Sequence, residues 1–291
     1  MYEELKKIGR KTKGIKMKKY SIENLQAIAR TLRRDTIRAI YLAGDGHPGP
    51  SLSAADIITA LYFGVMNIDP HNPKKQDRDR FILSKGHACP MLYAALAHAG
   101  YFSKDELPGL RSLHSILQGH PDMQKTPGID FTSGSLGNGL SSGLGMAISA
   151  KLQKQHWRTF VLLGDGELAE GVVWEAVLVA GHHKTANLTA IIDNNGMQSG
   201  GSVEDVTGIA PLADKFKSFG WHVIEIDGHD IQQILDGCNE AKEQTDRPTV
   251  LIAKTVKGRG VSYMIGDNSW HKRVFTQKEY EQAMQELGGK V

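Results

Sequence analysis

Two short polar segments, Gly164-Asp165-Gly166-Glu167 and Asn194-Asn195, are the residues whose types and spacing best suit chemistry. Twenty-seven residues separate the Gly-Asp-Gly from the Asn-Asn. Glycines on both sides of Asp165 let the backbone approach a phosphate without an intervening Cβ. Asp165 offers a carboxylate, Asn195 an amide oxygen and Met197 a backbone carbonyl, and Mg²⁺ prefers such oxygen ligands. The pattern predicts a diphosphate held through Mg²⁺, or through Ca²⁺ in its place.

The segments around these motifs predict how they meet. Residues 159–163 form a continuous apolar run, typical of a strand buried on both faces, and they end at the Gly-Asp-Gly. Residues 172–182 read as a helix, and a second apolar run at 188–192 leads to the Asn-Asn. Two successive βα turns would then share the carboxyl edge of a parallel sheet, where such folds bind ligands. Either motif alone is a common turn, but together they point to thiamine diphosphate.

The rest of the chain repeats this alternation. It predicts an α/β fold with a doubly wound, mainly parallel sheet and helices on both faces. The expected strands are 81–83, 159–163, 188–192, 222–226 and 249–254. A helix capped by Ser21 is expected to stop in the glycine- and proline-rich segment 43–48. Further helices are expected at 54–63, 90–99, 138–150, 172–182, 211–219 and 230–243, and residues 100–135 are expected to be largely loop.

Composition limits the class of protein. The chain has 291 residues, 40% apolar and 23% charged, which is ordinary for a soluble globular domain. No run of eighteen apolar residues indicates a membrane span, and no apolar signal core indicates export, so we expect a cytoplasmic protein. The two cysteines, Cys89 and Cys238, suggest no disulfide framework and are expected to be reduced thiols.

The formal net charge of +3 belongs to the N-terminus. Residues 1–19 carry eight Lys or Arg and two Glu, a local +6, so residues 20–291 sum to −3. A basic tail can touch nucleic acid or another acidic surface, but a solvated terminus is the simpler interpretation, and no nucleic-acid partner is expected. We therefore expect a basic tail at 1–19 and a single cofactor-binding domain at 20–291.

Four of the twelve histidines lie beside glycine, proline or tryptophan in predicted loops: His47, His87, His120 and His271. Loops at the top of an α/β sheet carry chemistry more often than core positions do. Neutral imidazoles can both donate and accept protons near pH 7. These four are the candidate catalytic residues, and the alternative is that they are surface or packing residues.

With these motifs together, the chain resembles the diphosphate-binding half of a transketolase from about residue 20 to about residue 275. The resemblance rests on many short motifs in family order. They are Gly46-His47-Pro48-Gly49, Ser84-Lys85-Gly86-His87-Ala88, Gly119-His120-Pro121, Gly134-Ser135-Leu136-Gly137-Asn138-Gly139, residues 164–171 and Trp270-His271.

The resemblance implies roles for individual residues. His47 would move protons on sugar hydroxyls, His87 and His271 would lie between diphosphate and substrate, and His120 would contact the donor's terminal hydroxyl. The family has proline and glutamine where Ser135 and Asn138 stand, so details of the contact at that segment differ. The residues implied to bind the cofactor are His87, Gly134, Ser135, Leu136, Gly164, Asp165, Gly166, Glu167, Glu170, Asp193, Asn195 and His271, with Asp165, Asn195 and Met197 on the metal.

Some of these roles have simpler alternatives. Glu170 is implied to communicate between cofactor sites across a dimer interface, but it can equally be an ordinary carboxylate at a helix N-terminus. Asp193 is a candidate supporting group behind the metal ligands. Lys254, Lys257 and Arg259 follow the last strand, in a segment that resembles the family's loop over the active-site channel. Their charges would offset the diphosphate, or they would simply solvate a loop.

Transketolases are normally more than twice this length, and no second α/β pattern follows residue 255. The next family domain supplies the glutamate that activates the cofactor and the arginines that hold the sugar phosphate. We therefore expect the N-terminal subunit of a split transketolase, completed by a C-terminal subunit in a heterotetramer, although truncation of a longer chain would give the same sequence. The implied reaction transfers a two-carbon ketol unit between sugar phosphates.

Three other functions remain open at this point. The chain could belong to another thiamine diphosphate enzyme, such as a deoxyxylulose phosphate synthase or a ketoacid dehydrogenase component. The four histidines favour sugar transfer over ketoacid oxidation. A cofactor-binding subunit without catalysis is disfavoured by the intact Asp165, Asn195 and histidines. A general nucleotide-binding module is disfavoured because the chain lacks the glycine-rich fingerprints of such proteins.

Overall fold

A five-stranded parallel sheet organises the protein. The computed structural model describes residues 20–289, so the basic segment 1–19 lies outside the described residues. The strand order is β1-β2-β3-β7-β6, and every neighbouring pair is parallel. The strands are β1 (Arg80–Leu83), β2 (Thr159–Gly164), β3 (Leu188–Asn194), β7 (Thr249–Lys254) and β6 (His222–Asp227). All five were predicted from apolar runs, and each is confirmed within two residues at either end.

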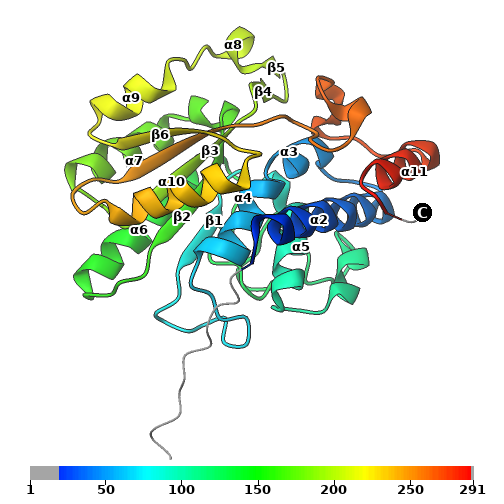
Figure 1. Ribbon diagram of the computed structural model, residues 1–291, viewed down its shortest axis with the longest axis horizontal. Helices are drawn as coiled ribbons and strands as arrows, with labels where there is room; N and C mark the ends of the chain where they lie inside the picture. The colour runs from blue at the N-terminus through cyan, green and yellow to red at the C-terminus, as the bar shows by residue number, and fades with distance from the viewer. Residues whose placement is uncertain (1–19, 290–291) are drawn as a thin grey trace, which may run out of the picture.

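Helices cover both faces of this sheet (Figure 1). Residues Phe160 and Leu162 of β2 pack into one hydrophobic cluster, and Val161 and Leu163 pack into another on the opposite face. This alternation is the two-residue period of a strand buried on both sides. The predicted doubly wound α/β fold is confirmed. One face holds α2 (Ile22–Ala43), α4 (Ala55–Ala60), α5 (Cys89–Ala99) and α10 (Ile231–Glu243), and the other holds α6 (Asn138–Leu152), α7 (Gly171–His182) and α9 (Leu212–Ser218).

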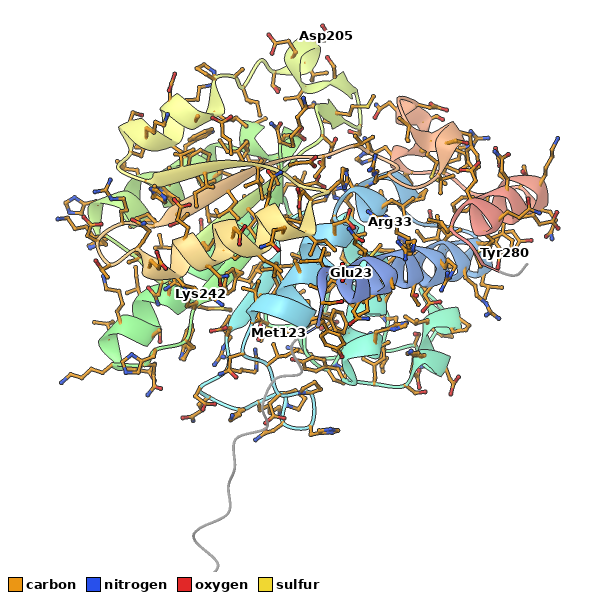
Figure 2. All side chains as sticks on the ribbon, viewed as in Figure 1. Glu23, Arg33, Met123, Asp205, Lys242 and Tyr280 are labelled. Atoms are coloured by element: carbon orange, nitrogen blue, oxygen red, sulfur yellow. The ribbon has the colours of Figure 1, made fainter. Side chains whose placement is uncertain are left out.

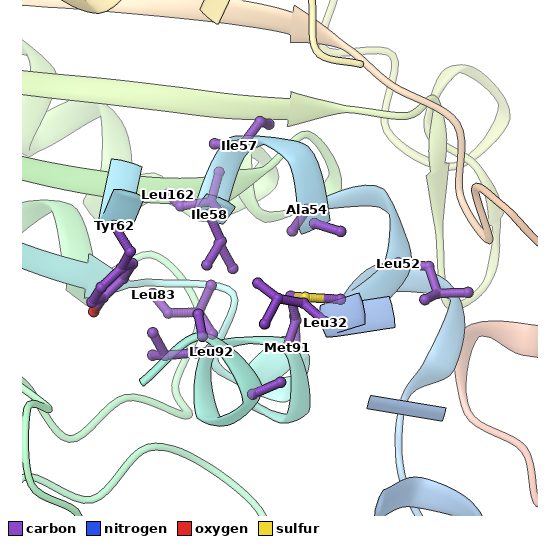
Figure 3. Close-up of a cluster of buried hydrophobic side chains, with 14 of the residues drawn as sticks. Leu32, Leu52, Ala54, Ile57, Ile58, Tyr62, Leu83, Met91, Leu92 and Leu162 are labelled. Atoms are coloured by element: carbon purple, nitrogen blue, oxygen red, sulfur yellow. The ribbon is translucent and has the colours of Figure 1, made fainter. Parts of the chain in front are cut away.

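The larger cluster lies under α2, α4 and α5. Figure 3 shows part of it, where Leu32 of α2, Ile58 of α4 and Met91 of α5 gather with Leu162 of β2. All four side chains are almost completely excluded from solvent. At roughly 25 cal/mol per Å² of apolar surface, burying each such side chain stabilises the fold by about 1.5–3 kcal/mol. This core fixes the helices from which active-site loops project.

Local signals explain where several helices begin and end. The Ser21 side chain accepts from the Asn24 amide, forming a capping box at the start of α2. The same helix ends at Gly44, whose positive φ of 63° suits glycine. Asp230 caps α10 by accepting from the amides of Gln232 and Gln233.

Several elements differ from the sequence prediction. The segment 43–48 was expected to be followed by a simple break, yet α3 (Pro48–Ser53) starts inside it, because proline is well tolerated in a first helical turn. The helix expected at 54–63 is α4 followed by a π-helical turn at Leu61–Val65. The prediction also missed α11 (Gln277–Glu286), a hairpin of β4 (Met197–Gln198) and β5 (Gly201–Ser202), and α8 (Val203–Val206).

Short 3-10 turns occupy much of the remaining loop, at Gly86–Ala88, Lys104–Gly109, Gly166–Ala169, Ser262–Met264 and Asn268–His271. Over residues 20–289, none of the helices combines the length and the apolar character needed to cross a bilayer. Both cysteines within this range are buried free thiols, as expected.

Candidate active site

The two motifs predicted to meet do meet, at the carboxyl edge of the sheet. β2 and β3 are neighbours, and Gly164 is in register with Asp193. A cavity of about 410 Å³ opens at this edge. Its lining comes from several separate loops and includes His47, Pro50, Lys85, His87, Gly134, Leu136, Gly164, Asp165, Gly166, Glu167, Glu170, Asn195, Met197, Gln198, Lys257 and His271.

Asp165 is buried at the base of this cavity, 2% exposed. Its carboxylate accepts from the amide of Gly166 at 2.8 Å and from the amide of Gly196 in the turn after β3. These bonds join the two βα turns directly. Burial and the nearby charge of Asp193 raise the pKa of Asp165 to about 6. A cation beside Asp165 would relieve both effects.

The turn after β3 presents further oxygen atoms. The side-chain oxygen of Asn195 accepts from the Met197 amide at 3.1 Å, which fixes the turn and leaves one lone pair. Gln198 also lines the cavity, and its amide oxygen is buried without a hydrogen-bond partner. The sequence analysis did not single out Gln198, because nothing in its local pattern shows that this oxygen would be left unpaired.

This donor set fits a metal ion that shares its ligands with a diphosphate. Among the residues from 20 to 289, no group of three or more His, Cys, Asp or Glu side chains is placed to hold a metal ion. The cavity instead offers the Asp165 carboxylate and amide oxygens from Asn195 and Gln198. Mg²⁺ is commonly bound through one or two carboxylates, with phosphate oxygens and water completing its shell.

Glu167 holds the surrounding loops together. Its carboxylate accepts from the Gly137 amide at 2.7 Å, from the Gly164 amide at 3.0 Å and from the Ser84 hydroxyl. Burial raises the pKa of Glu167, while these three donors act to lower it. With its oxygens already engaged, this carboxylate positions the glycine turns that line the cavity, although it was predicted as a residue that binds the cofactor.

A buried ion pair lies beneath the cavity floor. The Lys85 ammonium contacts the Asp193 carboxylate and donates to the Pro50 carbonyl at 3.0 Å. Asp193 also accepts from the hydroxyls of Ser53, at 2.6 Å, and Thr255. Burial alone would raise the pKa of Asp193, but Lys85 and the two hydroxyls bring it below its usual value. Asp193 thus supports the site from behind, as the resemblance suggested.

Three of the four predicted histidines form one cluster. The ring centres of His47 and His87 are 5.2 Å apart, those of His87 and His271 are 5.1 Å apart, and those of His47 and His271 are 5.6 Å apart. His47 precedes α3, His87 follows β1, and His271 ends a 3-10 turn. The fold therefore gathers imidazoles from widely separated parts of the chain.

These imidazoles are neutral near pH 7. Burial and the charges of Lys272 and Arg111 lower the pKa of His47 to about 4. Burial and Lys257 lower the pKa of His271 to about 3, and burial and Lys85 lower the pKa of His87 well below its usual range. Neutral rings can donate through one nitrogen and accept through the other, as proton transfer requires.

Lys257 contacts the histidine cluster directly. Its ammonium donates to Nδ1 of His271 at 2.9 Å and to the Asn268 side-chain oxygen at 2.8 Å. Burial and the charge of Lys85 lower the pKa of Lys257 to about 8, so it is still mainly protonated at pH 7. Because an ammonium only donates, the ring proton of His271 lies on Nε2. The sequence suggested a functional loop here without selecting this lysine.

The remaining predicted residues lie at the rim. Gly134 and Leu136 line the cavity, whereas Ser135 is exposed and lies outside the lining. His120 is also exposed and outside the lining, but its ring would be 3.7 Å from a Cβ built on Gly134. Glu170 lines the cavity from the start of α7, where its side chain makes no capping hydrogen bond.

Comparisons with known proteins agree with this geometry. Residues 24–290 match the family model described as "Transketolase, thiamine diphosphate binding domain". One of the two relatives that match over nearly their whole length is a subunit of the apulose-4-phosphate transketolase of Phocaeicola vulgatus, which is 39% identical over 93% of this chain and 96% of its own length. The other is the 6-deoxy-6-sulfo-D-fructose transketolase subunit SqwG of a Clostridium species, which is 41% identical over 91% of this chain and 96% of its own length.

Full-length transketolases match over a smaller share of their length. Human transketolase is 40% identical over 93% of this chain but only 43% of its own. The crystal structure of transketolase from Campylobacter jejuni superposes with a TM-score of 0.88 at 32% identity, covering 93% of this chain and 44% of that one. The chain therefore belongs to the transketolase family and corresponds to its thiamine diphosphate-binding domain.

Proposed function

We propose that this chain is the N-terminal subunit of a split transketolase that transfers a two-carbon ketol unit from a ketose phosphate to an aldose phosphate. The cofactors are thiamine diphosphate and Mg²⁺. The observation that carries the proposal is the cavity in which Asp165 and Asn195 face the cluster of His47, His87 and His271. One end of this cavity suits a metal-bound diphosphate, and the other suits proton transfer.

The relatives support the division into subunits. Two transketolase subunits match this chain over 96% of their own length, while the full-length human enzyme is matched over 43% of its length. A complementary polypeptide would close the cavity and complete the cofactor site. A two-fold pair of such heterodimers, located in the cytoplasm, is the simplest assembly.

Each group of residues then has a defined task. Asp165, Asn195 and the Met197 carbonyl would hold Mg²⁺, and Gly164 and Gly166 would let the diphosphate approach the backbone. Thiamine diphosphate, when bound, supplies the nucleophilic carbon that attacks the ketose carbonyl and carries the two-carbon unit to the aldose. Anchoring the diphosphate spends binding energy far from that carbon to fix the reactive ring.

The neutral histidines would handle the sugar protons. His47, His87 and His271 can each take a proton from a sugar hydroxyl at a free nitrogen and return it later. In His271 the Nδ1 atom is occupied by Lys257, so its Nε2–H is the group available to donate to a sugar oxygen. His120 at the rim would contact the terminal hydroxyl of the donor.

The test is ketol transfer from xylulose 5-phosphate to ribose 5-phosphate, with thiamine diphosphate and Mg²⁺. We expect no turnover from the purified chain, and turnover when the polypeptide encoded beside it is added. Robust turnover by the chain alone would refute the requirement for a partner. Replacing the donor by pyruvate tests the deoxyxylulose phosphate synthase alternative, and a donor panel that includes a sulfosugar tests substrate range.

The metal assignment has its own test. Asp165→Asn removes a carboxylate charge at nearly constant volume, and we expect it to abolish Mg²⁺-dependent binding of thiamine diphosphate. Asp246→Asn is the matched control, because Asp246 is exposed and paired only with its neighbour Arg247. Equal cofactor affinity in both variants would contradict the assignment of Asp165 to the metal.

A further inference from the structure

A buried relay of polar side chains begins on α2 and ends at the active-site loop. Arg33 of α2 and Asp56 of α4 form a two-pronged ion pair, with nitrogen–oxygen distances of 3.0 and 2.6 Å. Their side chains are 6% and 10% exposed. In Figure 2 the label of Arg33 lies on α2 near the centre of the molecule. Such a bidentate pair has a fixed geometry and can hold a third group in place.

His229 is that third group. It lies in the turn after β6, with its side chain 7% exposed, and its Nδ1 atom is 2.8 Å from the Asp56 carboxylate. On the other side of the ring, Nε2 accepts from the backbone amide of Val256 at 2.8 Å. An amide N–H only donates, so Nε2 carries no proton and Nδ1–H donates to Asp56. The relay therefore fixes one tautomer of His229.

Val256 is the central residue of a three-residue segment whose outer residues both reach into the site. Thr255 donates its hydroxyl to Asp193, and its amide donates to the Asn194 carbonyl at 3.1 Å. Lys257 donates to His271. Successive residues of an extended segment face opposite sides, so an anchor on Val256 sets where its two neighbours point.

We propose that His229 is a positioning residue of the active site, which holds the Val256 amide so that Lys257 stays in contact with His271. The inference rests on the proposed function only in expecting this contact to matter for the cofactor. His229 itself does not line the active-site cavity. It borders a neighbouring cavity of about 520 Å³ at the ends of β6 and β7, which also includes Val256.

Two substitutions separate this role from a general contribution to stability. His229→Gln places an amide oxygen near the position of Nε2 and can still accept from Val256. His229→Asn places its amide near Nδ1, so it keeps the donor to Asp56 but leaves Val256 without an acceptor. Each variant loses one hydrogen bond of the relay, so we expect similar losses of global stability. His222→Asn is the control, because His222 also bonds a carboxylate, Glu240, but on the surface.

The experiment measures amide hydrogen exchange at Val256 and the affinity of the full chain for thiamine diphosphate with Mg²⁺. Relative to wild type, we expect His229→Asn to speed the exchange and to weaken cofactor binding about tenfold, the effect of one unsatisfied buried donor. His229→Gln and His222→Asn should stay within about threefold of wild type. Nitrogen chemical shifts of His229 should show the proton on Nδ1.

The outcomes are distinct. Equal exchange at Val256 in the Asn and Gln variants, or a proton on Nε2, would overturn the proposed relay whether or not the cofactor binds. Faster exchange only in the Asn variant, with equal cofactor affinity in both, would overturn the coupling to the active site. If the wild-type chain binds no thiamine diphosphate, the proposed function fails, and the exchange data still decide the relay.

Discussion

Breaking the buried pair of Lys85 and Asp193 tests the energetics beneath the cavity. The two side chains are 1% and 0% exposed, so neither charge can be solvated after its partner is removed. Asp193→Leu leaves an ammonium with only the Pro50 carbonyl, and Lys85→Met leaves a carboxylate with two hydroxyl donors. We expect each single variant to lose about 3–5 kcal/mol of unfolding free energy.

The double variant Lys85→Met/Asp193→Leu removes both charges. It should be more stable than either single variant, with a remaining loss of about 2 kcal/mol because the hydroxyls of Ser53 and Thr255 lose their acceptor. Urea unfolding monitored by circular dichroism, at constant m-value, measures all three. Single losses below about 1 kcal/mol, or a double loss equal to the sum of the singles, would refute this reasoning.

A surface pair provides the control for that cycle. Lys75 and Asp77 are 3.3 Å apart, with side chains 40% and 62% exposed. The same substitutions, Lys75→Met and Asp77→Leu, should each change stability by less than about 1 kcal/mol. The folded pKa of Asp193 is lowered, so its stabilisation is present above about pH 4 and is lost as the pH falls through the folded value. Removing Asp193 should therefore flatten the acid limb of the stability curve.

Three further predictions concern other parts of the molecule. The pKa of His271 is lowered to about 3, so its C2 proton should show no NMR titration between pH 5 and 8, and its neutral folded form should make the protein less stable as the pH falls below about 6.5. A Cβ on Gly181 of α7 would meet the Phe219 carbonyl at 1.9 Å, whereas one on Gly171 meets nothing within 4 Å. Gly181→Ala should therefore lower the urea midpoint by the equivalent of about 1–3 kcal/mol, and Gly171→Ala should leave it nearly unchanged. Burial raises the pKa of the Cys89 thiol to about 12, so it should react with a disulfide reagent only after denaturation, and fast reaction of the native protein would contradict its burial.

Much of the fold was predictable because the sheet is buried on both faces. Each strand is then a continuous apolar run, which stands out from the sequence around it. The missed α3 begins with Pro48 and contains Gly49, residues that usually signal a break. The missed α11 carries a capping box from Thr276 to Glu279 that could have been recognised.

The site was predictable where chemistry and turn geometry share one segment. Asp165 between two glycines is readable locally, and so is a histidine beside glycine or proline. Gln198 and His229 were missed because their significance depends on partners far away in the chain. Asp56, for example, is 173 residues from His229. Lys85 was within reach, since it follows a buried strand and lies two residues before His87.

The single carboxylate at the metal position has a consequence for how the protein would be loaded. One aspartate and a few amide oxygens give a free divalent ion too little to hold it firmly, and a diphosphate without the ion would face the carboxylate of Asp165. Each ligand thus supplies what the other needs, and their binding should be strongly cooperative. The cavity would respond to the product of the two concentrations, as a coincidence detector does, and would stay empty when either the vitamin or magnesium is scarce.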